Sequence, residues 1–260
     1  MKKTLLIAGA ALALISCNMK NPLLTESTAP FGAPEFDKIK NEHYLPAFEQ
    51  GIAEAKAEID AIVANPDEPT FENTIVALDQ CGQLLRKVRG TFSPLSSSNS
   101  TEEMRALQKE MSPLFSAHND DIYLNEKLFA RVKTIYENRA ALTLTAEEAK
   151  ILENIYKRFV NSGANLSEEQ KAKLRELNKE LSMLQLTFSQ NLLHETNNTF
   201  VVAESIEELK GLPQANIDAA AKMAADNGQP GKWMFNMQRP SCNPVLQYCE
   251  NRELREKVYN

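Results

Sequence analysis

The sequence lacks most of the short motifs that mark a self-contained active site. It has no Cys-x-x-Cys pair, which argues against a structural zinc site and against thioredoxin-like chemistry. It also has no Gly-x-Ser-x-Gly turn for a nucleophilic serine and no glycine-rich loop that could hold a phosphate. The residues taken alone therefore predict a scaffold without a complete catalytic centre.

Histidine is scarce, and His43, His118 and His194 lie far apart in the sequence. Only His194 and Glu195 begin like the His-Glu-x-x-His helix of zinc peptidases, in which two histidines four residues apart bind one ion. The fourth residue after His194 is Asn198, so the second ligand is missing. We therefore expect no catalytic residue and no metal ligand within residues 1–260, and a solvated side chain at His194.

The chain is acidic: it has 29 Lys and Arg residues and 35 Asp and Glu residues, which gives a net charge of −6. A chain of this charge without a basic cluster is a poor partner for phosphate backbones, so we expect no nucleic-acid binding. Pairs of glutamates occur at 102–103, 147–148, 168–169 and 207–208. Each pair falls in the first turn of an expected helix, where it complements the helix dipole, so we do not interpret these pairs as metal ligands.

Three of the four cysteines are predicted to be structural or free. Cys81 falls on the apolar side of its expected helix. Cys242 and Cys249 are seven residues apart, which is about 10 Å along a helix and exceeds the roughly 7 Å limit for a disulfide. A bridge between them would require Pro244 to break the helix.

The chain begins with an apolar run that is too short to span a membrane. Residues 4–15 follow Lys2 and Lys3, and they provide about half of the roughly 20 residues that a spanning helix needs. A basic start followed by a short apolar run is typical of a secretion signal. We therefore predict that residues 1–16 form a signal peptide.

Residues 14–17 (LISC) resemble the bacterial lipobox, which predicts cleavage before Cys17 and lipid attachment to its thiol. Residues 17–33 are polar and contain Pro22 and Pro30, which predicts a flexible, lipid-anchored tether. Several acyl chains anchor a protein stably, so the expected location is the bacterial cell envelope, on a membrane. The alternative is an ordinary cleaved signal in which Cys17 is incidental.

The remaining residues, 34–260, predict a mainly α fold with a long helical hairpin and a minor two-stranded β element. Apolar residues recur at helical spacing along most of this region. Capping boxes are expected at Ser100–Glu103, Thr145–Glu148, Ser167–Gln170 and Ser205–Glu208. Residues 199–202 and 233–235 are rich in β-branched and aromatic residues and are expected to pair as strands.

The longest expected helix carries a heptad-like seam, which predicts one half of the hairpin. The seam consists of Leu174, Leu177, Leu181, Leu184 and Phe188. Serines 96–98, after Pro94, are interpreted as a loop. A last helix around residues 252–259 reaches Asn260 without a cap, which leads us to expect that the natural protein continues.

Eight segments in order give the chain a family resemblance. They are residues 36–48 (FDKIKNEHYLPAF), 69–74 (PTFENT), 122–125 (IYLN), 128–132 (LFARV), 188–193 (FSQNLL), 231–233 (GKW), 244–246 (PVL) and 251–255 (NRELR). Together they resemble the opening of the dipeptidyl carboxypeptidase and oligopeptidase A group, within the thimet oligopeptidase family of zinc metallopeptidases. The resemblance covers residues 33–260.

The resemblance implies two mostly helical lobes around a channel that admits short peptides. It also implies a zinc site, formed by a His-Glu-x-x-His helix and a later Glu, downstream of residue 260. The expected function is therefore the N-terminal channel lobe of an envelope peptidase, inactive alone, which as a full-length monomer releases C-terminal dipeptides from short peptides.

Two other functions remain open from the sequence alone. The chain could be a complete helical lipoprotein that acts as a peptide-binding or scaffold module. It could also be a truncated relative that binds peptides without cutting them. A reading frame that continued past Asn260 into a His-Glu-x-x-His motif would favour the peptidase over both.

Overall fold

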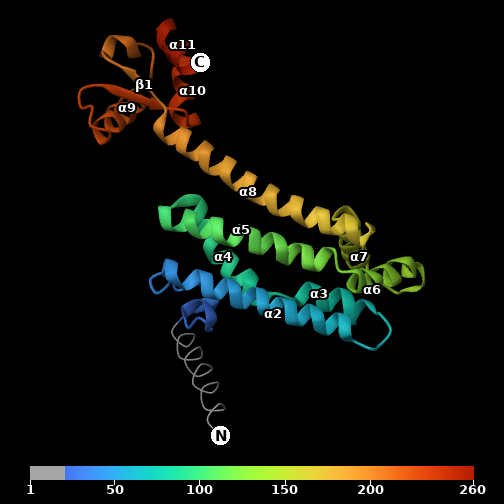
Figure 1. Cartoon of the computed structure of the whole chain (residues 1–260). Helices are drawn as coiled ribbons and strands as arrows, with labels where there is room; N and C mark the ends of the chain where they lie inside the picture. Colours follow the sequence, from blue (N-terminus) through green and yellow to red (C-terminus); the bar gives the residue numbers. More distant parts are fainter. Residues whose placement is uncertain (1–20) are drawn as a thin grey trace. The chain divides into compact units, whose positions relative to one another are not determined.

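The computed structural model describes residues 21–260, and the mainly α prediction is confirmed. The predicted signal peptide and Cys17 lie outside the described residues. The chain divides into two compact units, of which the first ends at Leu186 and the second comprises residues 187–260. Helix α8 crosses this boundary (Figure 1). Within residues 21–260, no helix is both long enough and apolar enough to cross a bilayer.

The first unit is built from helices that pack around two apolar clusters. Its helices are α2 (Tyr44–Ala64), α3 (Ala77–Gln80), α4 (Gln83–Ser98), α5 (Glu102–Tyr123), α6 (Glu126–Glu137), α7 (Ala146–Asn161) and the first part of α8 (Glu168–Asn198). Helix α2 packs along α4 and α5, and α6 packs on α7. The helix ends agree with the sequence at two places: α2 ends before Asn65 and Pro66, and Gly163 follows α7 with a φ of +98°.

One cluster joins the first half of α2 to α4 and α5 through aromatic rings. Phe92 meets the edges of Tyr44 and Phe48, with centroids 4.9 and 5.5 Å apart, and Phe115 meets Phe48 at 5.1 Å. Edge-to-face geometry is favoured because the positive ring edge lies against a negative ring face. This cluster therefore fixes the positions of α4 and α5 relative to α2.

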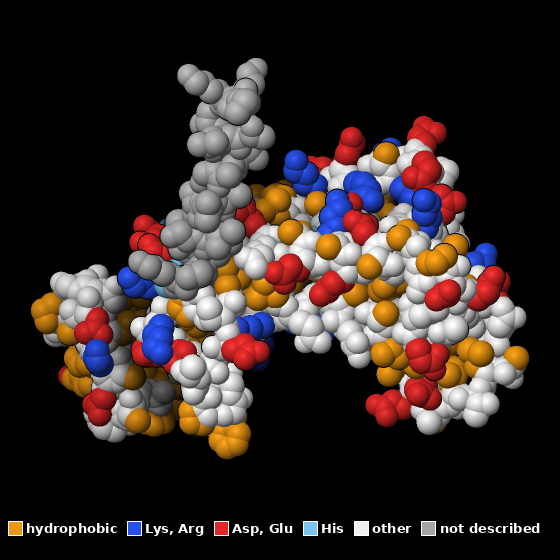
Figure 2. All heavy atoms as spheres, turned by 90° about the horizontal axis from the view of Figure 1, so that it is seen from below, with side chains coloured by type: hydrophobic (Ala, Val, Ile, Leu, Met, Phe, Trp, Pro, Cys, Tyr) orange, Lys and Arg blue, Asp and Glu red, His pale blue; other side chains and the backbone are white. Residues whose placement is uncertain are grey.

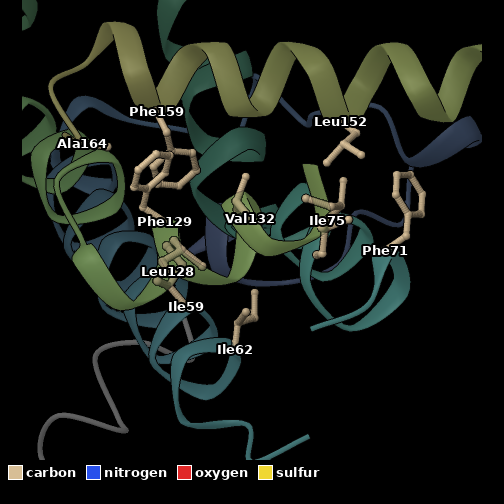
Figure 3. Packing of buried hydrophobic residues seen from close by; sticks show 11 residues of the cluster. Ile59, Ile62, Phe71, Ile75, Leu128, Phe129, Val132, Leu152, Phe159 and Ala164 are labelled. Carbon is tan, nitrogen blue, oxygen red and sulfur yellow. The ribbon is translucent and has the colours of Figure 1, made fainter. Parts of the chain in front are cut away.

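The other cluster joins the second half of α2 to α6 and α7 (Figure 3). Leu128, Val132, Leu152 and Phe159 are fully buried in it. The ring of Phe159 stacks on that of Phe129, with centroids 5.8 Å apart. These residues lie at helical spacing on α6 and α7, so the amphipathic pattern of the sequence is the cause of this packing.

Arg131 on α6 ties the loop after α2 to the body of the first unit. Its guanidinium donates to the carbonyls of Asn65 and Asp67 at 3.0 and 3.1 Å, and to side-chain oxygens of Asn73 and Thr74 at 3.1 and 3.2 Å. The last two acceptors belong to a π-helical turn over Phe71–Val76. One planar side chain thus replaces several backbone partners for a loop that contains two prolines.

The capping predictions are confirmed in part. Reciprocal boxes are present at Thr145–Glu148 and Ser167–Gln170. At Ser205 the backbone N–H donates to Glu208, at the start of a 3₁₀ turn. The box predicted at Ser100 is wrong, because α5 begins one residue later and Thr101 caps it by accepting from the N–H of Met104.

The serine-rich segment after Pro94 is helical, so the loop prediction there is wrong. Helix α4 continues to Ser98 and contains Pro94. The hydroxyls of Ser97 and Ser98 donate to backbone carbonyls three and four residues earlier in the chain. These bonds keep the segment helical although proline supplies no N–H.

Part of the segment expected to be a flexible tether packs against the helices. Leu23 is buried in the cluster that contains Tyr44 and Phe48. Asn21 donates to the carbonyl of His43 at 2.8 Å, and Lys87 donates to the carbonyl of Thr25 at 2.6 Å. The burial of an apolar side chain between these flanking bonds explains why residues 21–25 are held in place.

The second unit has a small β ribbon and a separate core. Strands β1 (Phe200–Ala203) and β2 (Trp233–Asn236) pair, as predicted. They run antiparallel, with Val201 opposite Phe235. Helices α9 (Gln214–Asp226), α10 (Arg239–Tyr248) and α11 (Arg252–Tyr259) complete it. Helix α10 continues through Pro244, and the thiols of Cys242 and Cys249 are free, so they form no disulfide.

Opposite charges are interspersed on one face of the described residues. On the face shown in Figure 2, Lys and Arg side chains lie among Asp and Glu side chains. At Glu153, for example, hydrogen bonds and charge from Lys150 and Lys157 lower the pKa of the carboxyl to about 2. This mixing agrees with the absence of a basic cluster in the sequence.

Candidate functional site

The histidines and cysteines of residues 21–260 are not brought together. His43 accepts a hydrogen bond from the backbone of Lys40, and His118 lies on α5. His194 is exposed on α8, with its ring 3.6 Å from the carboxylate of Glu195. Within this part of the chain, no group of three His, Cys, Asp or Glu side chains is placed to hold a metal ion.

A cavity of the first unit lies among α4, α5, the end of α7 and the first part of α8. Its volume is about 650 Å³. Apolar side chains of α2, α4 and α5 form one part of its wall, namely Phe48, Phe92, Met111 and Phe115. Hydroxyls and amides form another, namely Ser93, Ser96, Gln108, Ser112, Ser116, Asn119, Asn161, Ser162, Asn178, Ser182 and Gln185. Two side chains that line it, Arg89 and Asp120, can carry charge.

Asp120 is the buried acidic group of this cavity. Its relative exposure is 4%. Oδ1 accepts a hydrogen bond of 2.7 Å from the side-chain amide of Asn178. Burial raises the pKa of the Asp120 carboxyl, and the bond from Asn178 opposes that shift. The nearby cation, Arg175, is engaged elsewhere, because it forms its ion pair with Asp121 at 2.9 Å. Asp120 therefore has no ion-pair partner among the described residues.

Arg89 is the cationic group of the cavity. Its guanidinium lies over the ring of Phe115, 4.8 Å from the centroid, which is a cation–π contact. No carboxylate among the described residues pairs with it. The ring of Phe115 is itself fixed against Phe48, so the aromatic cluster of the core also orients this guanidinium. A planar cation held in this way keeps its donors available for an anionic ligand.

Helix α8 turns a polar face toward α5. The two helices are antiparallel, because Arg175 meets Asp121 and Ser112 donates to the carbonyl of Ser182. The predicted leucine seam is divided between two faces: Leu174 and Leu181 line the cavity beside α5, whereas Leu177, Leu184 and Phe188 are 51, 58 and 70% exposed. At about 100° per residue, Leu177 and Leu184 lie roughly 100–120° around α8 from Asn178. Only part of the predicted seam therefore faces α5.

The cavity was missed by reasoning from the sequence, because its residues come from several helices and share no motif. A signal was nevertheless present on α8. Asn178, Ser182 and Gln185 recur at spacings of four and three, which places them on one polar face of the helix. A polar face beside an apolar seam indicates that the helix can pack against other structure on two of its faces rather than on one.

The chain is similar to curated peptidases over most of its length. It is 38% identical to the dipeptidyl carboxypeptidase of Escherichia coli (strain K12) over 239 residues, which are 92% of this chain and 35% of that protein. It is 32% identical to oligopeptidase A of Haemophilus influenzae over 242 residues, which are 93% of this chain and 35% of the relative. No family model matches the chain.

These similarities confirm the resemblance seen in the sequence. Over this part of their length, the chain is a homologue of the proteins named dipeptidyl carboxypeptidase and oligopeptidase A. It spans about a third of the length of these relatives. A more distant relative is the thimet-like oligopeptidase of Dictyostelium discoideum, 24% identical over 88% of this chain.

Proposed function

We propose that the chain is the N-terminal, substrate-channel lobe of a zinc metallopeptidase of the cell envelope, which hydrolyses short peptides and releases C-terminal dipeptides. One observation supports this above the others: similarity to a dipeptidyl carboxypeptidase extends over 92% of the chain but over only 35% of the relative. A lobe of that size can contact substrate without containing the reaction centre.

The described residues do not fit a zinc site. The histidines are isolated from one another, and no three ligand-type side chains converge among residues 21–260. In this proposal zinc is bound by a part of the full-length protein that lies beyond Asn260. When bound, the ion would activate a water molecule for peptide hydrolysis.

The residues of this chain would act on the substrate by binding. The cavity presents hydroxyls and amides that can donate to peptide carbonyls and accept from peptide N–H groups. Its apolar wall, with Phe92 and Met111, can cover a substrate side chain. This division of polar and apolar surface suits short peptides of varied sequence, because backbone groups are common to all of them.

The test compares two proteins in the hydrolysis of an internally quenched fluorescent peptide. One is this 260-residue chain, and the other is the product of the complete reading frame from which it comes. We expect zinc-dependent hydrolysis in the longer product alone, abolished by a chelator. Zinc-dependent hydrolysis by the 260-residue chain would overturn the proposal, as would a complete product that binds peptides without cutting them.

The lipid anchor is the second part of the proposal. It is supported by the lipobox-like residues 14–17, and Cys17 is the residue that would carry the lipid. Replacement Cys17→Ala should move the protein from the membrane fraction to the soluble fraction after cell lysis. Cys81→Ala is the matched control and should leave the distribution unchanged. Membrane retention of the Cys17→Ala protein would contradict the anchor.

A further inference from the structure

We propose that the cavity of the first unit binds free short peptides by both ends, with Asp120 binding the N-terminal ammonium and Arg89 binding the C-terminal carboxylate. This inference deepens the proposed function and rests on it for the choice of a peptide as ligand. The site itself is defined by the side chains of this chain alone.

The state of Asp120 is the first support. A carboxylate that is removed from water without a cation is unfavourable, and one amide hydrogen bond compensates only part of the lost hydration. Asn178 supplies that bond, and Arg175 is held by Asp121. A primary ammonium brings three donors and a full positive charge. It therefore matches what Asp120 lacks among the described residues.

The state of Arg89 is the second support. Its guanidinium is oriented by the ring of Phe115 and has no carboxylate partner among the described residues. A guanidinium can bind a carboxylate with two parallel hydrogen bonds, and this geometry is stronger than a single contact. The C-terminus of a peptide is a carboxylate that every linear, unmodified peptide carries.

The size and lining of the cavity are the third support. About 650 Å³ lies within the range of small-molecule sites, roughly 300–1,000 Å³. An extended dipeptide spans about 7 Å, so a ligand of two or three residues is of suitable size. Hydroxyls of Ser112, Ser116 and Ser182 line the same cavity and can pair with the peptide groups between the two ends.

The test is calorimetric titration of the 260-residue chain with three ligands. The zwitterionic dipeptide Ala-Leu is compared with N-acetyl-Ala-Leu, which lacks the ammonium, and with Ala-Leu amide, which lacks the carboxylate. We expect Ala-Leu to bind, and each blocked form to bind roughly tenfold more weakly or worse. Absence of binding of Ala-Leu, or equal binding of all three ligands, would overturn the inference.

Four variants test which side chain binds which end of the peptide. In Asp120→Asn the free and acetylated peptides should bind equally, and in Arg89→Gln the free and amidated peptides should bind equally. The matched controls are Glu110→Gln and Arg86→Gln, which change an exposed acid of α5 and a base of α4 that do not line this cavity. They should preserve the preference for both free ends. A loss of preference in either control would also contradict the assignment.

Failure of this inference is separable from failure of the proposed function. If the complete product hydrolyses peptides in a chelator-sensitive way and Ala-Leu does not bind this chain, then the cavity assignment alone is wrong. If Ala-Leu binds with the expected end preferences and the complete product never hydrolyses peptides, then the peptidase proposal is wrong and the binding site stands. Circular dichroism of each variant checks that the helices are retained.

Discussion

The side-chain amide of Asn178 on α8 donates a 2.7 Å hydrogen bond to the buried carboxylate of Asp120 on α5. The two residues are 58 positions apart in the sequence. This hydrogen bond connects the polar face of α8 to the wall of the cavity. Through it, the carboxylate of Asp120 on α5 accepts a hydrogen bond from another helix. The stability of the first unit should therefore depend on this pair.

The first prediction concerns Asn178→Leu. The substitution leaves Asp120 buried without its amide donor, and an unsatisfied buried polar group costs about 1–3 kcal/mol. We expect the free energy of unfolding to fall by that amount in urea titrations. The variant Asn178→Leu with Asp120→Leu removes both partners and should recover part of the loss. No recovery in the double variant would show that the pair is not coupled.

The second prediction concerns pH. Burial raises the pKa of Asp120 above its ordinary value of 3.8, so the folded state holds the proton more tightly than the unfolded chain does. The resulting stabilisation is fully present below pH 3.8 and is lost as the pH rises through the higher folded pKa. We therefore expect Asp120→Asn to be more stable than the parent chain near pH 7, with the difference vanishing at low pH.

The measurement is urea unfolding of both proteins at several pH values. Glu110→Gln is the control, because that carboxyl is exposed on the same helix and does not line the cavity. A parent chain that gains stability relative to Asp120→Asn as the pH rises would contradict the prediction. Such a result would mean that the hydrogen bond from Asn178 lowers the pKa of Asp120 by more than burial raises it.

Local sequence patterns predicted the parts of the fold that depend on neighbouring residues. The reciprocal box at Thr145 and Glu148 and the strands predicted at residues 199–202 and 233–235 are of this kind. The predicted start of the helix at Ser100 was one residue too early, because the hydroxyl of Thr101 caps α5 in the same way. Chemically similar neighbours cannot be ranked from the pattern alone.

The cavity and the direction of the leucine seam depend on tertiary contacts, which a single sequence does not display. Leu177 and Asn178 are adjacent on α8, and either face could meet α5. The ion pair of Arg175 with Asp121 and the bond from Asn178 to Asp120 select the polar face. Heptad spacing identified an apolar stripe correctly, but it carried no information about which neighbour would cover that stripe.

The third prediction compares one substitution at two leucines. Leu152 on α7 is fully buried among Val132, Phe159 and Ile75, whereas Leu184 on α8 is 58% exposed. Leu152→Ala should lower the free energy of unfolding by about 2–5 kcal/mol, because it removes apolar contacts and leaves a cavity. Leu184→Ala should change it by less than about 0.5 kcal/mol. Similar losses at both positions in chemical denaturation would contradict the packing in Figure 3.

The fourth prediction concerns the guanidinium of Arg131. Lysine keeps the charge but cannot reproduce four bonds from a planar fork to Asn65, Asp67, Asn73 and Thr74. We expect Arg131→Lys to lose about 1–3 kcal/mol of stability and to speed hydrogen exchange in residues 65–76. Lys133→Ala on the same helix is the control, since its only described pair is a 3.8 Å contact with Glu137. Exchange that is equally fast in both variants would rule out this role.

The last prediction concerns the exposed stripe on α8. Leu177 and Leu184 are 51 and 58% exposed, and neighbouring apolar side chains at such exposure promote association between molecules. We expect the 260-residue chain to be helical by circular dichroism and to self-associate as its concentration rises.

The variant Leu177→Glu with Leu184→Glu should shift sedimentation velocity profiles toward the monomer while leaving the helix signal unchanged, since neither side chain is in the core. The paired control is Glu176→Gln with Glu180→Gln, which alters charge on the same helix without changing the stripe. The parent chain could remain monomeric at every protein concentration measured, or the glutamate variant could associate as strongly as the parent. Either result would show that the stripe does not drive association.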